Sequence, residues 1–148
     1  MKKLLFLASA VVLSAGLFGQ QSKADSVIKF KETSYDFGKI KQSVPVTHDF
    51  NFSNVSNSAL IIESATASCG CTTPTKPEGA VAKGKDDKIT AGFNAAVPGP
   101  FNKTIFVKVT GVDTPIQLKI TGEVLTADAY SKYQAEKTNS VKTSKSGS

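Results

Sequence analysis

Hydrophobic and polar residues alternate along most of the chain between residues 25 and 125. In the segment "VTHDFNF", Val46, His48, Phe50 and Phe52 fall on one face and the residues between them fall on the other. Segments 88–93, 103–109 and 115–124 alternate in the same way. A period of two is typical of strands that bury one face only. This part of the chain is therefore predicted to form sheets.

Shorter apolar runs at 27–30, 34–40 and 59–67 add three further strands, and turn-forming residues separate the runs. The result is seven or eight short strands, with no convincing helix among them. Strands of this kind suit antiparallel sheets that pack face to face. The sequence therefore predicts an all-β fold, an immunoglobulin-like antiparallel β-sandwich over residues 25–125. A small barrel is the alternative, and the Trp of antibody domains is missing.

The first residues have a different composition. Lys2 and Lys3 precede an apolar run over 4–18, and "SKA" ends at Ala24. This pattern is typical of a secretory signal peptide, and the run is shorter than the roughly 20 residues of a membrane span. We therefore expect a signal peptide over 1–24, a mature chain from Asp25 without a stable membrane span, and export to the periplasm, the cell surface or the medium.

The last residues, 126–148, are rich in Ser, Thr and Lys and contain little to bury. Such a segment is predicted to be a flexible tail. A short helix from Asp128 to about Lys137 would place Tyr130 and Tyr133 on one face. The tail is either a spacer for surface attachment or a frayed terminus.

The charge distribution narrows the choice of partners. The chain has 18 basic residues, all of them Lys, and a net charge of +6. Removal of Lys2, Lys3 and Lys23 would leave 15 Lys against 12 acidic residues, or +3. Arg is the usual residue for bidentate recognition of phosphate and guanine, so its absence argues against nucleic acid. We expect an envelope or extracellular protein or glycan as partner, and no cofactor.

The two cysteines, Cys69 and Cys71, are separated only by Gly70. In an extended strand such residues lie about 6.6 Å apart, the upper limit for a disulfide, and Gly70 allows the chain to bend. A bridge across three residues would stabilise the fold by only about 1.6 kcal/mol. The role of the pair is therefore local: a disulfide or structural thiols, a labile redox couple, or ligands for Cu(I). Zinc prefers four ligands, and His48 is the only histidine.

No catalytic residue is predicted. His48 shares a face with Phe50 and is interpreted as a structural histidine at the edge of the core. Asp86 and Asp87 are interpreted as a solvated turn between strands. Asn54, which opens an N-x-S pattern, is expected at an outward-facing or turn position.

Several segments together resemble one bacterial family. They are "YDFGKI", "VTHDFNFSN", "ALIIESATASCGCTTP", "KITAGFN" and "PGPFNKTIFVKVTG". Over about residues 28–124 the chain resembles the family known as domain of unknown function 1573. The resemblance implies a β-sandwich similar to those of sperm-protein and cilium-associated domains, export to the periplasm or cell surface, and no established activity. The chain departs from it at "AKGK" (82–85), where members often have a Pro-Gly turn.

Three functions remain in competition. The first is an exported, non-enzymatic binding or structural module of the cell envelope. The alternative is a copper- or thiol-redox-handling protein that uses Cys69 and Cys71. A hydrolase is the third, and no nucleophile motif of the G-x-S-x-G type supports it.

Overall fold

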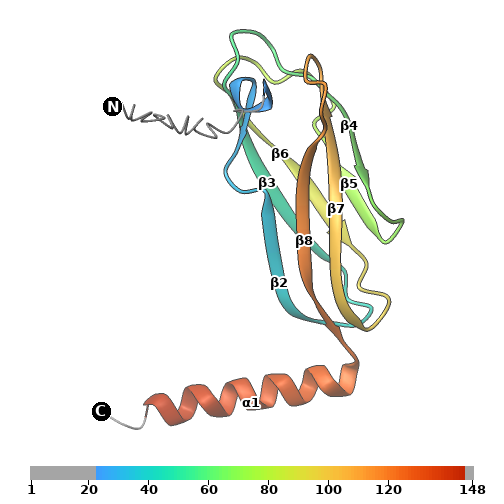
Figure 1. Cartoon of the computed structure of the whole chain (residues 1–148). Coiled ribbons are helices and arrows are strands. Elements are labelled where there is room, and N and C mark those ends of the chain that lie inside the picture. The colour runs from blue at the N-terminus through green and yellow to red at the C-terminus, as the bar shows by residue number, and fades with distance from the viewer. Residues whose placement is uncertain (1–22, 146–148) are drawn as a thin grey trace, which may run out of the picture.

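The computed structural model describes residues 23–145 and contains two four-stranded sheets packed face to face (Figure 1). The strand orders are β1-β3-β6-β5 and β2-β8-β7-β4. This confirms the prediction of an immunoglobulin-like β-sandwich. The eight strands are β1 (Ile28–Phe30), β2 (Ser34–Lys41), β3 (Val46–Asn54), β4 (Ile62–Ala67), β5 (Thr72–Thr75), β6 (Asp86–Phe93), β7 (Gly99–Val109) and β8 (Ile116–Leu125).

One strand pair departs from the antiparallel prediction, because β2 runs parallel to β8. The chain leaves the sheet of β1 after Phe30 and enters the other sheet at Ser34, where β2 joins the edge beside β8. The pairing shifts register between Asp36 and Lys39. Gly38 has a φ of 63° there, and its N–H donates to Asp36 Oδ1 at 2.9 Å. The glycine allows this bulge because residues with a Cβ avoid that conformation.

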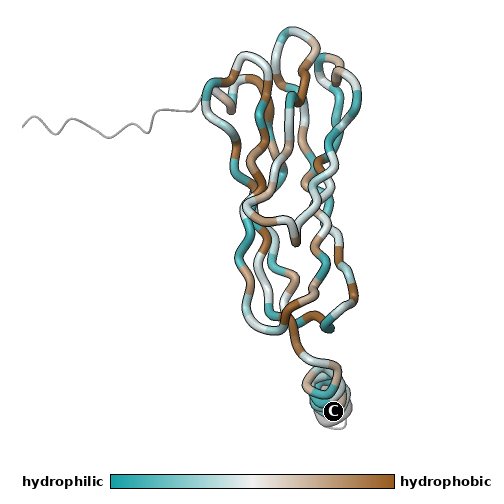
Figure 2. The backbone as a smooth tube through the Cα atoms, turned by 90° about the vertical axis from the view of Figure 1, so that its right-hand side faces the viewer, coloured by the Kyte–Doolittle hydropathy of each residue, from teal (hydrophilic) through white to brown (hydrophobic). Residues whose placement is uncertain are grey.

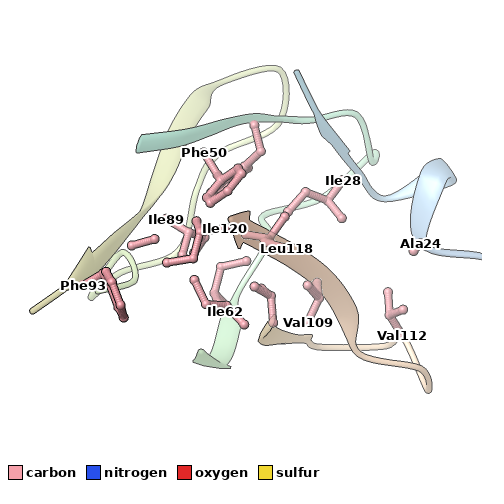
Figure 3. Packing of buried hydrophobic residues seen from close by; sticks show 14 of the residues in the cluster. Ala24, Ile28, Phe50, Ile62, Ile89, Phe93, Val109, Val112, Leu118 and Ile120 are labelled. Atoms are coloured by element: carbon pink, nitrogen blue, oxygen red, sulfur yellow. The ribbon is translucent and has the colours of Figure 1, made fainter. Parts of the chain in front are cut away.

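The core lies between the sheets and is built from the faces that the alternation predicted (Figures 2 and 3). Phe50 and Phe52 of β3 are fully buried, whereas Asn51 between them is exposed. Completely buried partners on the other strands include Ile89, Ala91, Ile105, Val107, Leu118 and Ile120. Burial of one such large side chain is worth about 1.5–3 kcal/mol, so this layer dominates the stability of the sandwich.

The predicted end of the signal peptide falls beside the first described element. A short 3-10 helix, η1 (Lys23–Ser26), precedes β1. Ala24 is 8% exposed and belongs to the core cluster, and its carbonyl accepts a hydrogen bond from the Val27 N–H at 2.9 Å. The predicted end of the signal peptide therefore lies inside a packed element. Residues 1–22 of that prediction lie outside the described residues.

The carboxyl-terminal segment forms a longer helix than the sequence indicated. Helix α1 (Ala127–Lys145) has 19 residues and leaves the sandwich at a wide angle (Figure 1). Over residues 127–139 the helix has no buried side chain, and local hydrogen bonds support it: the Thr138 hydroxyl donates to the Gln134 carbonyl at 2.9 Å. The Nζ of Lys39 lies 5.0 Å from the centre of the Tyr133 ring, which links α1 to β2. Among the described helices, none has the length and apolar character needed to cross a membrane.

Candidate functional site

Cys69 and Cys71 are joined by a disulfide, with an S–S distance of 1.99 Å and a Cα–Cα distance of 5.4 Å. The bond lies in the arch of residues 68–71 that carries the chain from β4 in one sheet to β5 in the other. Gly70 lies at its exposed tip. The Cα distance is below the 6.6 Å expected for an extended strand because the chain turns here, with the Thr72 N–H donating to the Cys69 carbonyl at 3.3 Å. In this oxidised form neither sulfur is a thiolate ligand.

Hydrogen bonds tie the arch to both sheets. The Ser68 N–H donates to the Thr104 carbonyl of β7 at 2.9 Å, and the Asn94 N–H donates to the Cys71 carbonyl at 3.1 Å. Cys71 packs against the core, and the Cys69 Sγ lies 3.7 Å from the Thr72 hydroxyl. The disulfide therefore stiffens a connection between two layers.

Two other loops meet at the end of the sandwich from which α1 leaves, here called the exit end (Figure 1). Ser43 in the β2–β3 loop has a φ of 61°, and Ala95 in the β6–β7 loop has a φ of 52°. Across residues 23–145 these are the two non-glycine residues with positive φ. They contact each other, because the Ser43 N–H donates to the Ala95 carbonyl at 2.9 Å. A left-handed conformation costs about 1–2 kcal/mol per residue, and such strain concentrates at functional sites.

Each of these loops presents an exposed Val-Pro pair. The side chain of Val97 is 75% exposed and that of Val44 is 47% exposed. Gln42 braces the loops, since its Nε2 donates to the Ala96 carbonyl at 3.1 Å. The exit-end patch is defined as Val44, Pro45, Val97 and Pro98. Sequence reasoning missed this patch; the repeated Val-Pro pairs were the available signal.

His48 lies on β3 and contacts neither cysteine, because β6 separates β3 from β5. Its Nε2 lies 2.9 Å from Glu32 Oε1, and its ring stacks on Tyr35 with centroids 3.6 Å apart. The His48 ring also packs edge-on against the Phe50 ring, with centroids 4.8 Å apart. The structural interpretation of His48 stays a prediction, and these contacts support it.

Two sequence interpretations of polar residues were wrong. Asp86 and Asp87 are the first residues of β6 rather than a turn, because their backbone pairs with β3 opposite Ser53 and Phe52. For Asn54 only the outward-facing part was wrong: the residue stands at the turn that follows β3, where its Oδ1 accepts from the Ser56 N–H, but it is 1% exposed. Its Nδ2 donates to carbonyl groups of two loops, and these hydrogen bonds hold the side chain in the interior.

Charged side chains on the outer faces form isolated pairs. The Lys88 ammonium and the Thr90 hydroxyl each donate to Asp49 at 2.6 Å, and these hydrogen bonds lower the pKa of that carboxyl below its ordinary value. Across the described residues, no group of three or more His, Cys, Asp or Glu side chains is arranged to hold a metal ion. Exposed pairs of this kind contribute little to stability.

A hollow of about 560 Å³ lies at the other end of the sandwich, here called the entry end. Ala24, Ile28 and Phe30 line it from one side, and Val112 of the β7–β8 connection and Ile116 of β8 line it from the other. Its size falls in the range of small-molecule sites. Loss of Ala24 by processing would remove part of its wall.

Solved structures share this fold at low identity. A protein of unknown function from Porphyromonas gingivalis matches with a TM-score of 0.55 and 12% identity, over 66% of this chain and 46% of that one. The secreted serine protease VesC from Vibrio cholerae matches at 0.54 and 11%, over 68% and 24%. The ASH/PapD-like domain 7 of human CEP192 matches at 0.54 and 11%, over 77% and 96%. These likenesses show the fold alone, and this chain spans about half of the first protein and a quarter of the protease.

Curated protein sequences include no match to this chain. One family does match, described as protein of unknown function (DUF1573), over residues 28–124. The match begins at the first residue of β1 and ends within β8, so it contains the disulfide arch and both loops of the exit end. The chain therefore belongs to the DUF1573 family.

Proposed function

We propose that this protein is an exported, non-enzymatic module of the cell envelope that binds another protein through the exit-end patch. The observation that carries the proposal is the 2.9 Å hydrogen bond between Ser43 and Ala95, two strained residues that fix both loops. Strain of this kind lowers stability, so a gain elsewhere must offset it. In this proposal the strained loops hold the exposed side chains of Val44 and Val97 in a fixed position for binding, and the free energy of binding offsets the strain.

The patch has the properties of a preorganised contact surface. Valine and proline side chains lose little rotamer freedom on binding, and the loops that carry them are already hydrogen-bonded to each other. Preorganisation lowers the entropic cost of association. Exposed apolar groups on a rigid support are typical of protein interaction sites.

The chemistry of the patch favours a protein over a glycan. Sugars are recognised by converging hydrogen-bonding groups, whereas Val44 and Val97 offer only aliphatic surface. Such a surface gains free energy when it is covered by apolar side chains of a partner. A protein with an exposed apolar residue is therefore the expected ligand.

The disulfide fits this role as a brace. Asn94 donates to the Cys71 carbonyl and directly precedes the strained Ala95, so the arch and the β6–β7 loop are coupled. Disulfides persist outside the cytoplasm, in agreement with the expected signal peptide. Binding of Cu(I) requires free thiolates, which the oxidised arch does not offer, whereas thiol–disulfide exchange at the Cys69–Cys71 bond stays the alternative.

The test compares two matched double variants. Val44→Ser with Val97→Ser removes the apolar surface of the exit end, whereas Val55→Ser with Ile61→Ser removes residues 46% and 50% exposed at the entry end. Each protein is used to capture partners from envelope extract, and the captured proteins are quantified by mass spectrometry. We expect the exit-end variant to lose its main partner at least about tenfold, since removal of two interface anchors at about 1 kcal/mol each exceeds the roughly 1.4 kcal/mol of a tenfold change. The same partner retained by the exit-end variant, or lost equally by both, would overturn the proposal.

A further inference from the structure

The sandwich has four edge strands, and three of them are protected against pairing. They are β1, β2 and β5. Strand β5 contains Pro74, which lacks an N–H; β1 has only three residues. Strand β2 has a bulge and carries charged side chains on both sides of it, Asp36, Lys39 and Lys41. Proline, short length, bulges and charge are the usual means by which proteins prevent edge-to-edge association.

The fourth edge strand, β4, has a register shift and the charged Glu63 at its start, between Ile62 and Ser64, but it lacks these features over residues 64–67. Its four side chains are small and uncharged, and its register with β7 is regular from Ser64 to Ala67. The Ser68 N–H points to β7, where it meets the Thr104 carbonyl. Because backbone groups alternate along a strand, the N–H and C=O of Ala65 and Ala67 point away from β7, toward the free edge.

The disulfide arch fixes the end of this edge. Ser68 makes two contacts with Thr104, through its N–H at 2.9 Å and its hydroxyl at 3.2 Å. The Cys69–Cys71 bond follows immediately and turns the chain into the other sheet. Strand β4 therefore ends at a rigid point and keeps its edge extended beside β7.

We infer that the free edge of β4 pairs in antiparallel fashion with β4 of a second copy of this chain, about a two-fold axis at Ala65. This register places Ala65 opposite the partner's Ala65 and Ser64 opposite the partner's Thr66. It also places Glu63 opposite the partner's Ala67. The pairing joins two four-stranded sheets into one of eight strands. This inference is independent of the exit-end patch.

The edge is complementary to itself, which selects a second copy as its occupant. No like charges meet in the register, and Glu63 is paired with Lys108 of its own sheet at 3.1 Å. Ser64 and Thr66 are a favourable cross-strand pair, and the closed two-fold symmetry leaves no free β4 edge, so that only the protected β2 strands end the joined sheet. The pairing involves five residues per chain, well below the roughly 1,200 Å² of a stable interface, so a dissociation constant weaker than about 1 µM is expected.

A charge-swap experiment tests the register. Ser64 and Thr66 face outward, whereas Ala65 and Ala67 pack against the core, so charges at 64 and 66 are compatible with the fold. Sedimentation of the full chain over a concentration series should show a monomer–dimer equilibrium. Ser64→Lys with Thr66→Lys, and Ser64→Glu with Thr66→Glu, should each weaken it at least about tenfold because like charges then face each other. An equimolar mixture of the two variants should restore association.

A control pair adds the same charge elsewhere on that sheet face. Gln117→Lys with Thr121→Lys lies on β8, two strands away from the β4 edge, and should leave the dimer unchanged. Far-ultraviolet circular dichroism establishes that each variant is folded. A wild-type protein that sediments as a monomer at every concentration would overturn the inference, as would a dimer that both charged variants retain.

Amide hydrogen exchange locates the contact independently of any substitution. The N–H groups of Ala65 and Ala67 should exchange several-fold more slowly as concentration rises. Those of Ser64 and Thr66 already point to β7 and should not change. A dimer whose formation leaves the Ala65 and Ala67 amides unaffected would place the interface elsewhere and contradict the pairing.

Discussion

The two ends of the sandwich are held together in different ways. At the entry end, the buried side chain of Asn54 joins two loops: its Nδ2 donates to the Ser58 and Val81 carbonyls, both at 2.8 Å. Its Oδ1 accepts from the Ser56 N–H at 2.9 Å and the Ser56 hydroxyl at 2.7 Å. At the exit end, backbone hydrogen bonds and a nearby disulfide hold loops that contain two strained residues.

The difference shows that a covalent bond need not mark the most stable part of a fold. Removal of a fully satisfied buried amide loses all of its hydrogen bonds at once. The disulfide closes a loop of only three residues and restricts the unfolded chain little. The entry end thus contributes stability, whereas the exit end maintains the shape of an exposed surface.

Replacement of Asn54 should give the largest effect. Asn54→Ala removes four hydrogen bonds and leaves the Ser56 N–H without its partner, so we expect a loss of about 2–4 kcal/mol in the free energy of unfolding. Denaturation by urea measures it. Asn57→Ala is the matched control in the loop that follows β3, since Asn57 is exposed and its Oδ1 accepts from the Lys83 ammonium at 3.0 Å. Equal effects of the two substitutions would show that Asn54 has no special role.

Reduction of the disulfide should have a smaller effect. Opening the Cys69–Cys71 bond without other change should lower the free energy of unfolding by about 1.6 kcal/mol or less, because the closed loop is so short. Urea denaturation with and without reductant measures the difference. The variant with both Cys69→Ser and Cys71→Ser should not respond to reductant. A loss above about 3 kcal/mol on reduction would mean that the arch is a main support of the fold.

The sandwich could be predicted from the sequence because burial in it follows a local rule. The alternation through Phe50, Ile89, Ile105 and Leu118 is the same pattern that the packed sheets require, and no distant information is needed. The position of the cysteine pair and of its bend at Gly70 is equally local.

The two ends could not be predicted because their features depend on contacts between distant segments. The Asn54 side chain is buried only because Val81, 27 residues away, supplies a carbonyl for it. The left-handed conformations of Ser43 and Ala95 arise where two separate loops meet. The length of α1 was missed for another reason: its polar composition resembles that of an unstructured tail.

The smallest effect in this comparison is expected at Ser43, and its sign is opposite to the others. Ser43→Gly removes the Cβ from a residue with a φ of 61°, so it should raise the free energy of unfolding by up to about 1 kcal/mol. Ser34→Gly, in the exposed part of β2, should instead lower it by about 0.5–1 kcal/mol, because glycine weakens an ordinary strand.

The binding measurement decides what the strain at Ser43 is for. Glycine also gives the β2–β3 loop more conformations, so the Ser43→Gly protein should bind the partner captured by the exit-end patch less tightly although it unfolds less readily. Affinity for that partner, measured beside the unfolding curves, separates the two effects. A more stable protein with unchanged affinity would show that the strained pair is a by-product of loop packing, and that the entry and exit ends differ in structure but not in purpose.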